Sequence, residues 1–162
     1  MTEAMQESNG NGSTQSGQFA LKKLYIKDLS FESPNAPAIF EDPGVASADP
    51  QVKLNLKNSH KSLGDNHCEV VLHVSVHATL NDKSLFMVEI EQAGVFKISG
   101  YSDAEKKKLI GTHCPSALFP YAREAVSSLI GKGGFPAMLL QPINFDAIYA
   151  QITEDTVTAG SA

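Results

Sequence analysis

The clearest pattern of the chain is HCEVVLHVSVHATLNDKSLFMVEIEQAGVFKIS, residues 67–99. Its first half alternates apolar with mostly polar residues, which predicts a strand with one buried face, because successive side chains of a strand point to opposite faces. The apolar face comprises Val70, Leu72, Val74, Val76 and Ala78. Asn81 and Asp82 predict a tight turn. Residues 85–99 then return as a second strand, in which Gly94 indicates a bulge or a close backbone approach.

Two more strands are predicted before this pair. Residues 51–57 place three apolar side chains on one face and lysine or asparagine on the other, which is typical of a half-buried strand. Residues 58–66 are expected to form a turn region. Residues 19–31 carry apolar and charged side chains on both faces, so this strand is expected to be partly exposed on each side. Prolines predict loops at residues 33–37 and 41–50.

Helices are predicted only after residue 100. Residues 102–105, SDAE, fit a capping box at the start of one helix. Residues 116–130 repeat apolar side chains at spacings of three and four, which predicts a second helix. Asn144 is expected to cap a last helix. An order of strands first and helices afterwards indicates an α+β fold, with about four antiparallel strands and the helices packed on one face.

The length of 162 residues suits one compact domain with polar ends. Residues 1–18 are too polar to bury the surface that would offset the entropy of ordering them, so a disordered N-terminal tail is expected. Residues 153–162 are expected to form a flexible C-terminal tail. The folded domain is therefore predicted to span residues 19–152.

The composition excludes several classes of function. The net charge of −5 disfavours nucleic acid as a partner, because an acidic domain repels phosphate. No signal peptide and no apolar segment of the ~20 residues that a membrane helix needs are present, so no direct membrane insertion is expected. Two cysteines are too few for a disulfide framework. These features together predict a cytoplasmic protein.

Three motifs resemble chemical sites, and each has a simpler interpretation. His73 and His77 share a strand face, but no further metal ligand follows at a recognised spacing. His113 precedes Cys114, yet neighbouring residues in sequence point apart, and a buried thiol is the simpler interpretation. The glycines in residues 131–134 follow a helix, as a helix stop does, whereas a phosphate loop precedes one. No metal, cofactor or catalytic residue is therefore expected.

Two further groups of residues leave a functional and a structural interpretation open. The apolar loop contains Phe135, Met138, Leu139, Leu140 and Ile143. It forms either ordinary core or subunit interface, or one wall of an apolar groove. The acidic group comprises Asp28, Glu32, Glu89 and Glu91. It forms either a docking surface or the exposed face of a sheet.

Several ordered motifs resemble the SecB family of bacterial protein-export chaperones. They are YIKDLSFESPNAP at residues 25–37, CPSALFPYARE at residues 114–124, GFP at residues 134–136 and PINFDA at residues 142–147. The resemblance extends from Phe19 to about Gln151. The chain departs from the family pattern in lacking the tryptophan that the family often has.

The resemblance implies a homotetramer, built as a dimer of dimers, that is not an enzyme. Such a chaperone would hold precursor proteins unfolded and deliver them to SecA, the motor of the Sec translocase. Matching positions imply that SecA docks through its C-terminal zinc-bearing tail on Asp28, Glu32, Met87 and Glu89. Matching strand positions imply an oligomer interface that includes Val88, Ile90 and Gln92. The residues expected to line the client groove are Val52, Leu54, Leu56, Tyr121, Phe135, Met138 and Leu140.

Two alternative functions remain at this stage. An apolar small-ligand binding module would be a monomer with a closed cavity. A thiol enzyme using Cys114 would need a reactive, accessible thiol.

Overall fold

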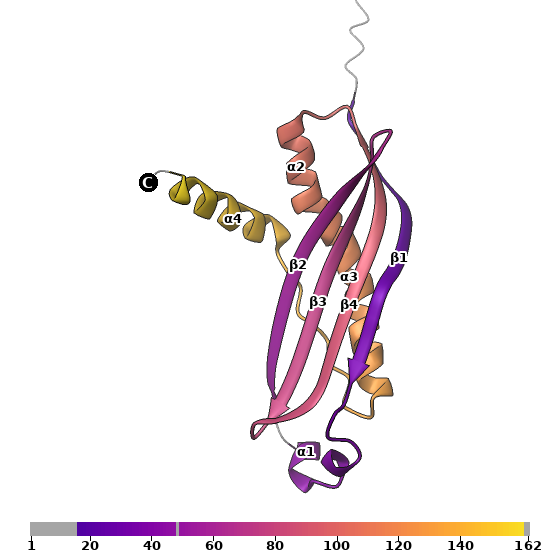
Figure 1. Cartoon of the computed structure of the whole chain (residues 1–162), viewed down its shortest axis with the longest axis vertical. Helices are drawn as coiled ribbons and strands as arrows, with labels where there is room; N and C mark the ends of the chain where they lie inside the picture. Colours follow the sequence, from indigo (N-terminus) through magenta and orange to yellow (C-terminus); the bar gives the residue numbers. More distant parts are fainter. Residues whose placement is uncertain (1–15, 48, 161–162) are drawn as a thin grey trace, which may run out of the picture.

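The computed structural model describes residues 16–47 and 49–160, which form one four-stranded sheet with helices on one face (Figure 1). The elements in order are β1 (Gln18–Glu32), the 3-10 helix η1 (Ala38–Phe40), α1 (Pro43–Ser47), β2 (Gln51–Gly64), β3 (His67–Leu80), β4 (Lys83–Ser99), α2 (Asp103–Gly111), α3 (His113–Lys132) and α4 (Phe145–Ala159). The predicted α+β fold is confirmed. Of the N-terminal tail predicted as disordered, residues 1–15 lie outside the described residues.

The strands pair antiparallel in the order β1-β4-β3-β2, so β1 and β2 are the edges of the sheet. Two-residue turns join β2 to β3 and β3 to β4. Asp65, Asn66, Asn81 and Asp82 form these turns with φ angles of 50°, 61°, 50° and 62°. Asparagine and aspartate tolerate this left-handed backbone, and such turns match the twist of the strands they connect. The predicted turn at Asn81 and Asp82 is confirmed.

β1 carries two bulges, at Lys22 and Lys27, where its register with β4 shifts. Each extra residue reverses the alternation of side chains that follows it. The face shared with the core therefore receives Phe19, Leu21, Leu24, Ile26, Leu29 and Phe31. The opposite face receives Asp28, Ser30 and Glu32 in the second half of the strand. The two bulges explain why the alternation in residues 19–31 looked mixed.

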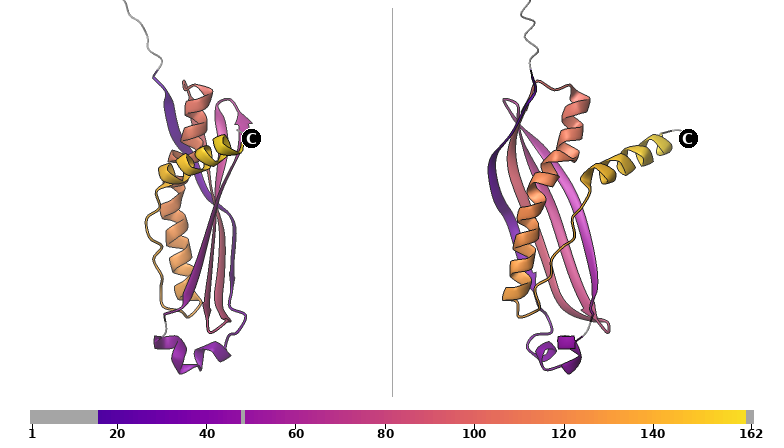
Figure 2. Two further views of the ribbon diagram at one scale, coloured as in Figure 1. Left: turned by 90° about the vertical axis from the view of Figure 1, so that its left-hand side faces the viewer. Right: turned by 180° about the vertical axis from the view of Figure 1, so that it is seen from behind.

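The helices lie along one face of the sheet, and α4 stands away from it (Figure 2). Ser102 and Glu105 form the predicted capping box at the start of α2. Asn144 caps α4 as predicted, because its Oδ1 accepts a hydrogen bond from the backbone N–H of Ala147 at 3.0 Å. The buried ring of Phe145 holds the first turn of α4 by an edge-on contact with Phe119 at 5.8 Å between centroids.

The core forms between α3 and the inner face of β3 and β4. The alternating apolar residues of β3 are all fully buried there, as their pattern predicted. Gly94 lets α3 come close, since a Cβ added at this position would lie 3.0 Å from the Leu118 Cδ2. The groups that come close to Gly94 are the side chains of Leu118, Leu21 and Phe96, whereas the sequence pattern suggested a bulge or a backbone approach.

Three predicted boundaries differ from the structure. The turn region predicted for residues 58–66 is wrong, because β2 pairs with β3 as far as Gly64. Backbone hydrogen bonds to β3 extend this edge strand without an apolar pattern to reveal it. The loop predicted for residues 41–50 contains the short helix α1. The tail predicted for residues 153–162 is helical as far as Ala159, where α4 ends.

Candidate functional site

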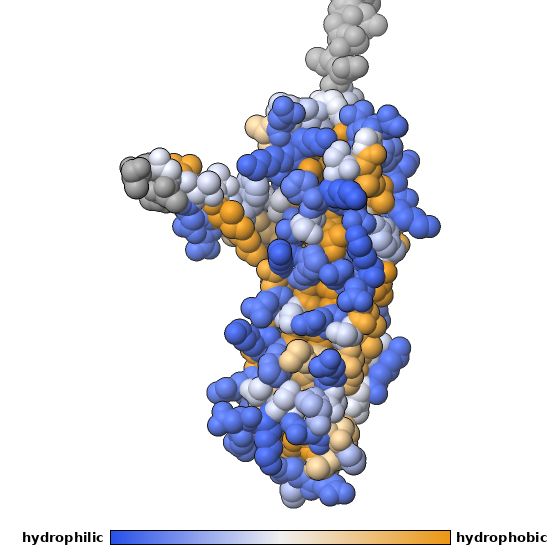
Figure 3. Space-filling view, in the orientation of Figure 1, coloured by the Kyte–Doolittle hydropathy of each residue, from blue (hydrophilic) through white to orange (hydrophobic). Residues whose placement is uncertain are grey.

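The sheet face that the helices leave open, termed here the outer face, carries the predicted docking residues together. Register places Asp28 opposite Glu91, Ser30 opposite Glu89 and Glu32 opposite Met87. The acidic face is defined here as Asp28, Glu32, Met87, Glu89 and Glu91. Asp28, Glu32 and Glu89 are exposed, and Met87 and Glu91 are half-buried. Figure 3, which views the outer face, shows hydrophilic side chains over most of it.

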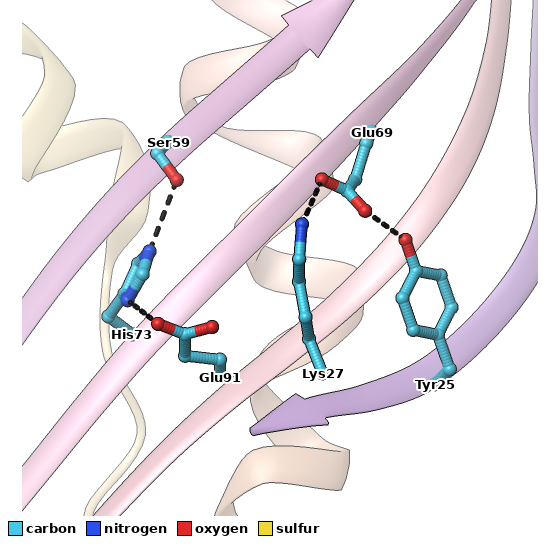
Figure 4. A network of polar contacts seen from close by, with 6 residues as sticks. All are labelled: Tyr25, Lys27, Ser59, Glu69, His73 and Glu91. Atoms are coloured by element: carbon cyan, nitrogen blue, oxygen red, sulfur yellow. Dashed lines mark hydrogen bonds and ion pairs between the residues drawn. The ribbon is translucent and has the colours of Figure 1, made fainter. Parts of the chain in front are cut away.

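A polar network beside the acidic face ties β1 to β3 across β4 (Figure 4). The Tyr25 hydroxyl donates a hydrogen bond to one oxygen of the Glu69 carboxylate. The Lys27 Nζ contacts the other oxygen at 2.7 Å. Partial burial, followed by the contact with the Glu69 carboxylate, raises the pKa of Tyr25 to about 12. The hydrogen bonds from Lys27 and Tyr25 lower the pKa of Glu69.

A second polar network joins β2, β3 and β4 on the same face (Figure 4). The His73 Nδ1 lies 3.2 Å from the Glu91 Oε1, and its Nε2 lies 3.1 Å from the Ser59 Oγ. A cavity of about 270 Å³ opens beside it and is lined by charged and polar residues together with Leu56, Val74 and Ile90. No group of three or more metal-ligating side chains occurs among the described residues.

The inner face of β2 remains partly uncovered. Its apolar residues Val52, Leu54 and Leu56 continue the core face of β3. Val52 and Leu54 nevertheless remain 42% and 39% exposed. α3 lies over the other strands, and the chain between α3 and α4 crosses the sheet beside it (Figure 2). β2 therefore presents an apolar strip that the described part of the chain does not cover.

Two cavities lie along this strip. One, of about 390 Å³, lies between β2, α1 and the loop after α3. Another, of about 310 Å³, lies between β2 and α4. The β2 groove is defined here as Val52, Leu54, Leu56, Met138, Leu139, Ile148 and Ile152. Figure 3 shows apolar surface running along α4 toward the sheet.

The residues expected to line the client groove divide into three sets. Val52, Leu54, Leu56 and Met138 belong to the β2 groove. Phe135 and Leu140 are each only 6% exposed and pack in the core, although Phe135 also forms part of a cavity wall. Tyr121 is exposed on α3 but lines neither of the two cavities along β2.

Leu139 was not among the expected groove residues, yet it is 64% exposed and borders the larger cavity. Its place in an apolar loop was the available signal. The identity of the loop residues does not reveal which of two neighbouring leucines points outward.

The residues expected at an oligomer interface lie inside the single chain. Val88, Ile90 and Gln92 are buried on the core face of β4. The Gln92 Nε2 donates a hydrogen bond to the backbone carbonyl of Tyr25 at 3.1 Å, which ties β1 to β4. Their side chains therefore cannot touch a partner subunit directly while the chain keeps this packing. A role in assembly stays a prediction, and it would act by positioning β1.

The thiol expected of an enzyme is enclosed. Cys114 is buried, and burial raises its pKa well above the ordinary range. A thiol held protonated and away from solvent is a poor nucleophile.

The glycines in residues 131–134 end α3 and do not form a phosphate loop. The backbone N–H of Gly133 donates a hydrogen bond to the Leu129 carbonyl at 2.8 Å.

None of the helices in the described residues has the length and apolar character needed to cross a membrane.

Comparison with known proteins is consistent with this geometry. The family model described as preprotein translocase subunit SecB matches residues 12–156. A protein-export protein SecB of Marinobacter nauticus is 49% identical over 146 residues, covering 90% of this chain and 86% of its own. A protein-export protein SecB of Nitrosococcus oceani is 47% identical, covering 91% and 89% of the two chains. The Mycobacterium tuberculosis SecB-like chaperone Rv1957, solved with a ChAD peptide from the HigA1 antitoxin Rv1956, has the same fold. Its TM-score is 0.64 at 16% identity, over 78% of this chain and 91% of that one.

Proposed function

Because the chain belongs to the SecB family and acts as a chaperone in protein export, we propose that it holds unfolded precursors in the β2 groove and passes them on from the acidic face. The observation that carries this proposal is the uncovered apolar strip of Val52, Leu54 and Leu56. An exposed apolar strip of this kind marks a place where another apolar chain binds. In the described part of the chain, no strand pairs with β2 on the side away from β3, so an extended client could add main-chain hydrogen bonds there.

The energetics favour long, unfolded clients. Fixing one client residue costs roughly 1–2 kcal/mol of backbone entropy. Burying one leucine or phenylalanine side chain returns about 1.5–3 kcal/mol. A short segment in one groove therefore gains little, whereas a long segment that reaches several grooves gains affinity through its effective concentration. We infer that the chaperone selects the unfolded state of its client and reads little of the client's sequence.

We propose that several grooves are supplied by a homotetramer. β1 is an edge strand, and Leu21, Ile26 and Leu29 are exposed on its inner side. A long edge strand with exposed apolar side chains tends to pair with another copy of itself. A dimer formed through β1 would leave β2, at the opposite edge of the sheet, free for clients. No enzymatic activity is proposed for this assembly, which would act in the cytoplasm.

We further propose that the acidic face binds the basic, zinc-bearing C-terminal tail of SecA. Asp28, Glu32 and Glu89 point from adjacent strands toward solvent, and Met87 provides an apolar contact among them. The acidic face and the β2 groove lie on opposite faces of the sheet. Client holding and handover are therefore proposed to use separate surfaces.

The holding function is tested by light scattering of a client diluted from denaturant, with and without the chaperone. The wild-type chain is expected to form a tetramer whose mass increases by that of the unfolded client. Leu54→Ser should weaken holding, whereas Lys53→Ser, on the outer face of the same strand, should not. A monomer that leaves client aggregation unchanged would contradict the proposal. A monomer that retains a lipid-like molecule in mass spectrometry would favour the small-ligand module instead.

The docking function is tested with the SecA tail in calorimetry. Glu89→Lys should weaken tail binding and leave client holding intact. Glu41→Lys makes the same charge change away from the acidic face and serves as the control. Equal loss of tail binding and client holding in Glu89→Lys would refute the separation of the two surfaces.

A further inference from the structure

We propose that His73 makes docking on the acidic face sensitive to pH, by controlling how much negative charge Glu91 offers to a basic partner. This inference rests on the docking part of the proposed function and adds its regulation. His73 lies on β3, next to the acidic face, with its Nδ1 3.2 Å from the Glu91 Oε1. Both side chains are about one-third exposed, so protons and a docking partner can reach them.

Both nitrogens of His73 have partners that suit either charge state. In the neutral ring, the geometry fits a proton on Nδ1 that is donated to Glu91, while Nε2 accepts from the Ser59 hydroxyl. In the protonated ring, Nε2 donates to the same hydroxyl, whose oxygen can accept. Protonation therefore changes the charge of the site without requiring any side chain to move.

The surroundings of His73 are of mixed charge. Lys57 lies directly opposite it on β2, and Glu91 lies directly opposite it on β4. Asp28 and Glu89 line the same cavity from β1 and β4. With a neutral His73, the carboxylates that line this cavity (Asp28, Glu89 and Glu91) face one positive charge, that of Lys57. With a protonated His73, a second positive charge pairs with Glu91, and the cluster attracts a basic segment less strongly.

Histidine is the side chain that ordinarily changes charge between pH 5 and 8. Because binding linkage is reciprocal, a proton on His73 and a basic segment on the acidic face disfavour each other. A charge pair at a partly exposed position changes affinity by about two- to five-fold. Docking of a basic segment should therefore tighten by this factor as pH rises from 6 to 8.

The test measures binding of a labelled peptide of alternating lysine and serine, with an amidated C-terminus, by fluorescence anisotropy. The label blocks the N-terminal amine, so the peptide has no group that titrates between pH 6 and 8, and any pH dependence belongs to the chaperone. The full chain is compared at pH 6, 7 and 8 at one low ionic strength. Wild type should bind about two- to five-fold more tightly at pH 8 than at pH 6. His73→Gln should lose most of this pH dependence.

His77, four residues further along β3 and on the same face, provides a matched control. The His77 Nε2 bonds to the Ser84 Oγ at 3.0 Å, whereas His73 faces a carboxylate. His77→Gln should therefore keep the pH dependence of wild type. Circular dichroism would establish that each surface variant is folded.

The outcomes separate this inference from the proposed docking function. If the peptide does not bind, or if Glu89→Lys binds it as well as wild type does, the docking surface is refuted and the inference with it. If Glu89→Lys weakens binding but wild type shows no pH dependence, only the role of His73 is refuted. The same conclusion follows if His73→Gln keeps the pH dependence of wild type.

Discussion

Leu139 and Leu140 are neighbours in sequence, and the same substitution should affect them in opposite ways. Leu139 is 64% exposed at the edge of the β2 groove, whereas Leu140 is 6% exposed in the core. Truncation of a fully buried leucine to alanine removes three carbons. At about 0.8 kcal/mol for each carbon, this loses about 2.4 kcal/mol of the favourable free energy of burial. Only the exposed part of Leu139 becomes newly buried when a client binds. Leu139→Ala should therefore cost about 1–1.5 kcal/mol of client affinity, or roughly five- to tenfold.

The stability of the folded chain should respond in the reverse order. Leu140→Ala leaves a cavity in the core and should lower the free energy of unfolding by about 2–5 kcal/mol. Leu139→Ala removes little packing and should change stability by less than about 0.5 kcal/mol.

Two measurements distinguish these effects. Calorimetry with a short apolar peptide, which occupies a single groove and avoids avidity, reports client affinity. Urea unfolding followed by circular dichroism reports stability. If Leu139→Ala binds the peptide as wild type does, the groove assignment is refuted. If Leu140→Ala weakens peptide binding as strongly while remaining fully folded, the division between groove and core is refuted.

Two further predictions concern the sheet. Glu69 has a lowered pKa in the folded chain, so its contribution to stability is present above its unfolded pKa and is lost as pH falls through the folded one. Glu69→Gln should therefore remove part of the acid sensitivity of thermal unfolding below about pH 5, and an unchanged pH profile would contradict this role. Gly94→Val adds a Cβ 3.0 Å from Leu118 and should destabilise the chain by about 1–3 kcal/mol in urea unfolding. Thr79→Val, on β3, is the control in which little change is expected, and equal losses would argue against a close approach of α3 at Gly94.

The sequence predicted the parts of the fold in which a single face is buried. The alternation in β3 is clear because one side of that strand packs under α3 and the other lies on the outer face. The end of β2 was not predicted, because an edge strand can be held by backbone pairing without an apolar pattern. The continuation of α4 beyond residue 152 was missed for a related reason. Residues 153–157 are exposed, so no buried stripe marks this part of the helix.

The candidate site was predicted less completely than the fold. The acidic residues were identified in the sequence, and the strand register then placed them side by side. The apolar residues of the loop were also identified, but the sequence did not divide them between groove and core. Phe135 and Leu140 have the same chemistry as Met138 and Leu139, and only the path of the loop across the sheet separates them. Local patterns do not determine such a path.

The bulge at Lys27 gives the acidic face an unusual vulnerability, because the backbone conformation at one position controls the polarity of a whole surface. If Lys27 were instead paired in strict alternation, without the bulge, the rest of β1 would rotate by one position. Asp28 and Glu32 would then point toward the core, and Leu29 and Phe31 toward solvent. No acidic residue would have been replaced, yet the surface they form would be gone. Over evolutionary time, the bulge at Lys27 should therefore be kept more strictly than many of the residues that β1 carries.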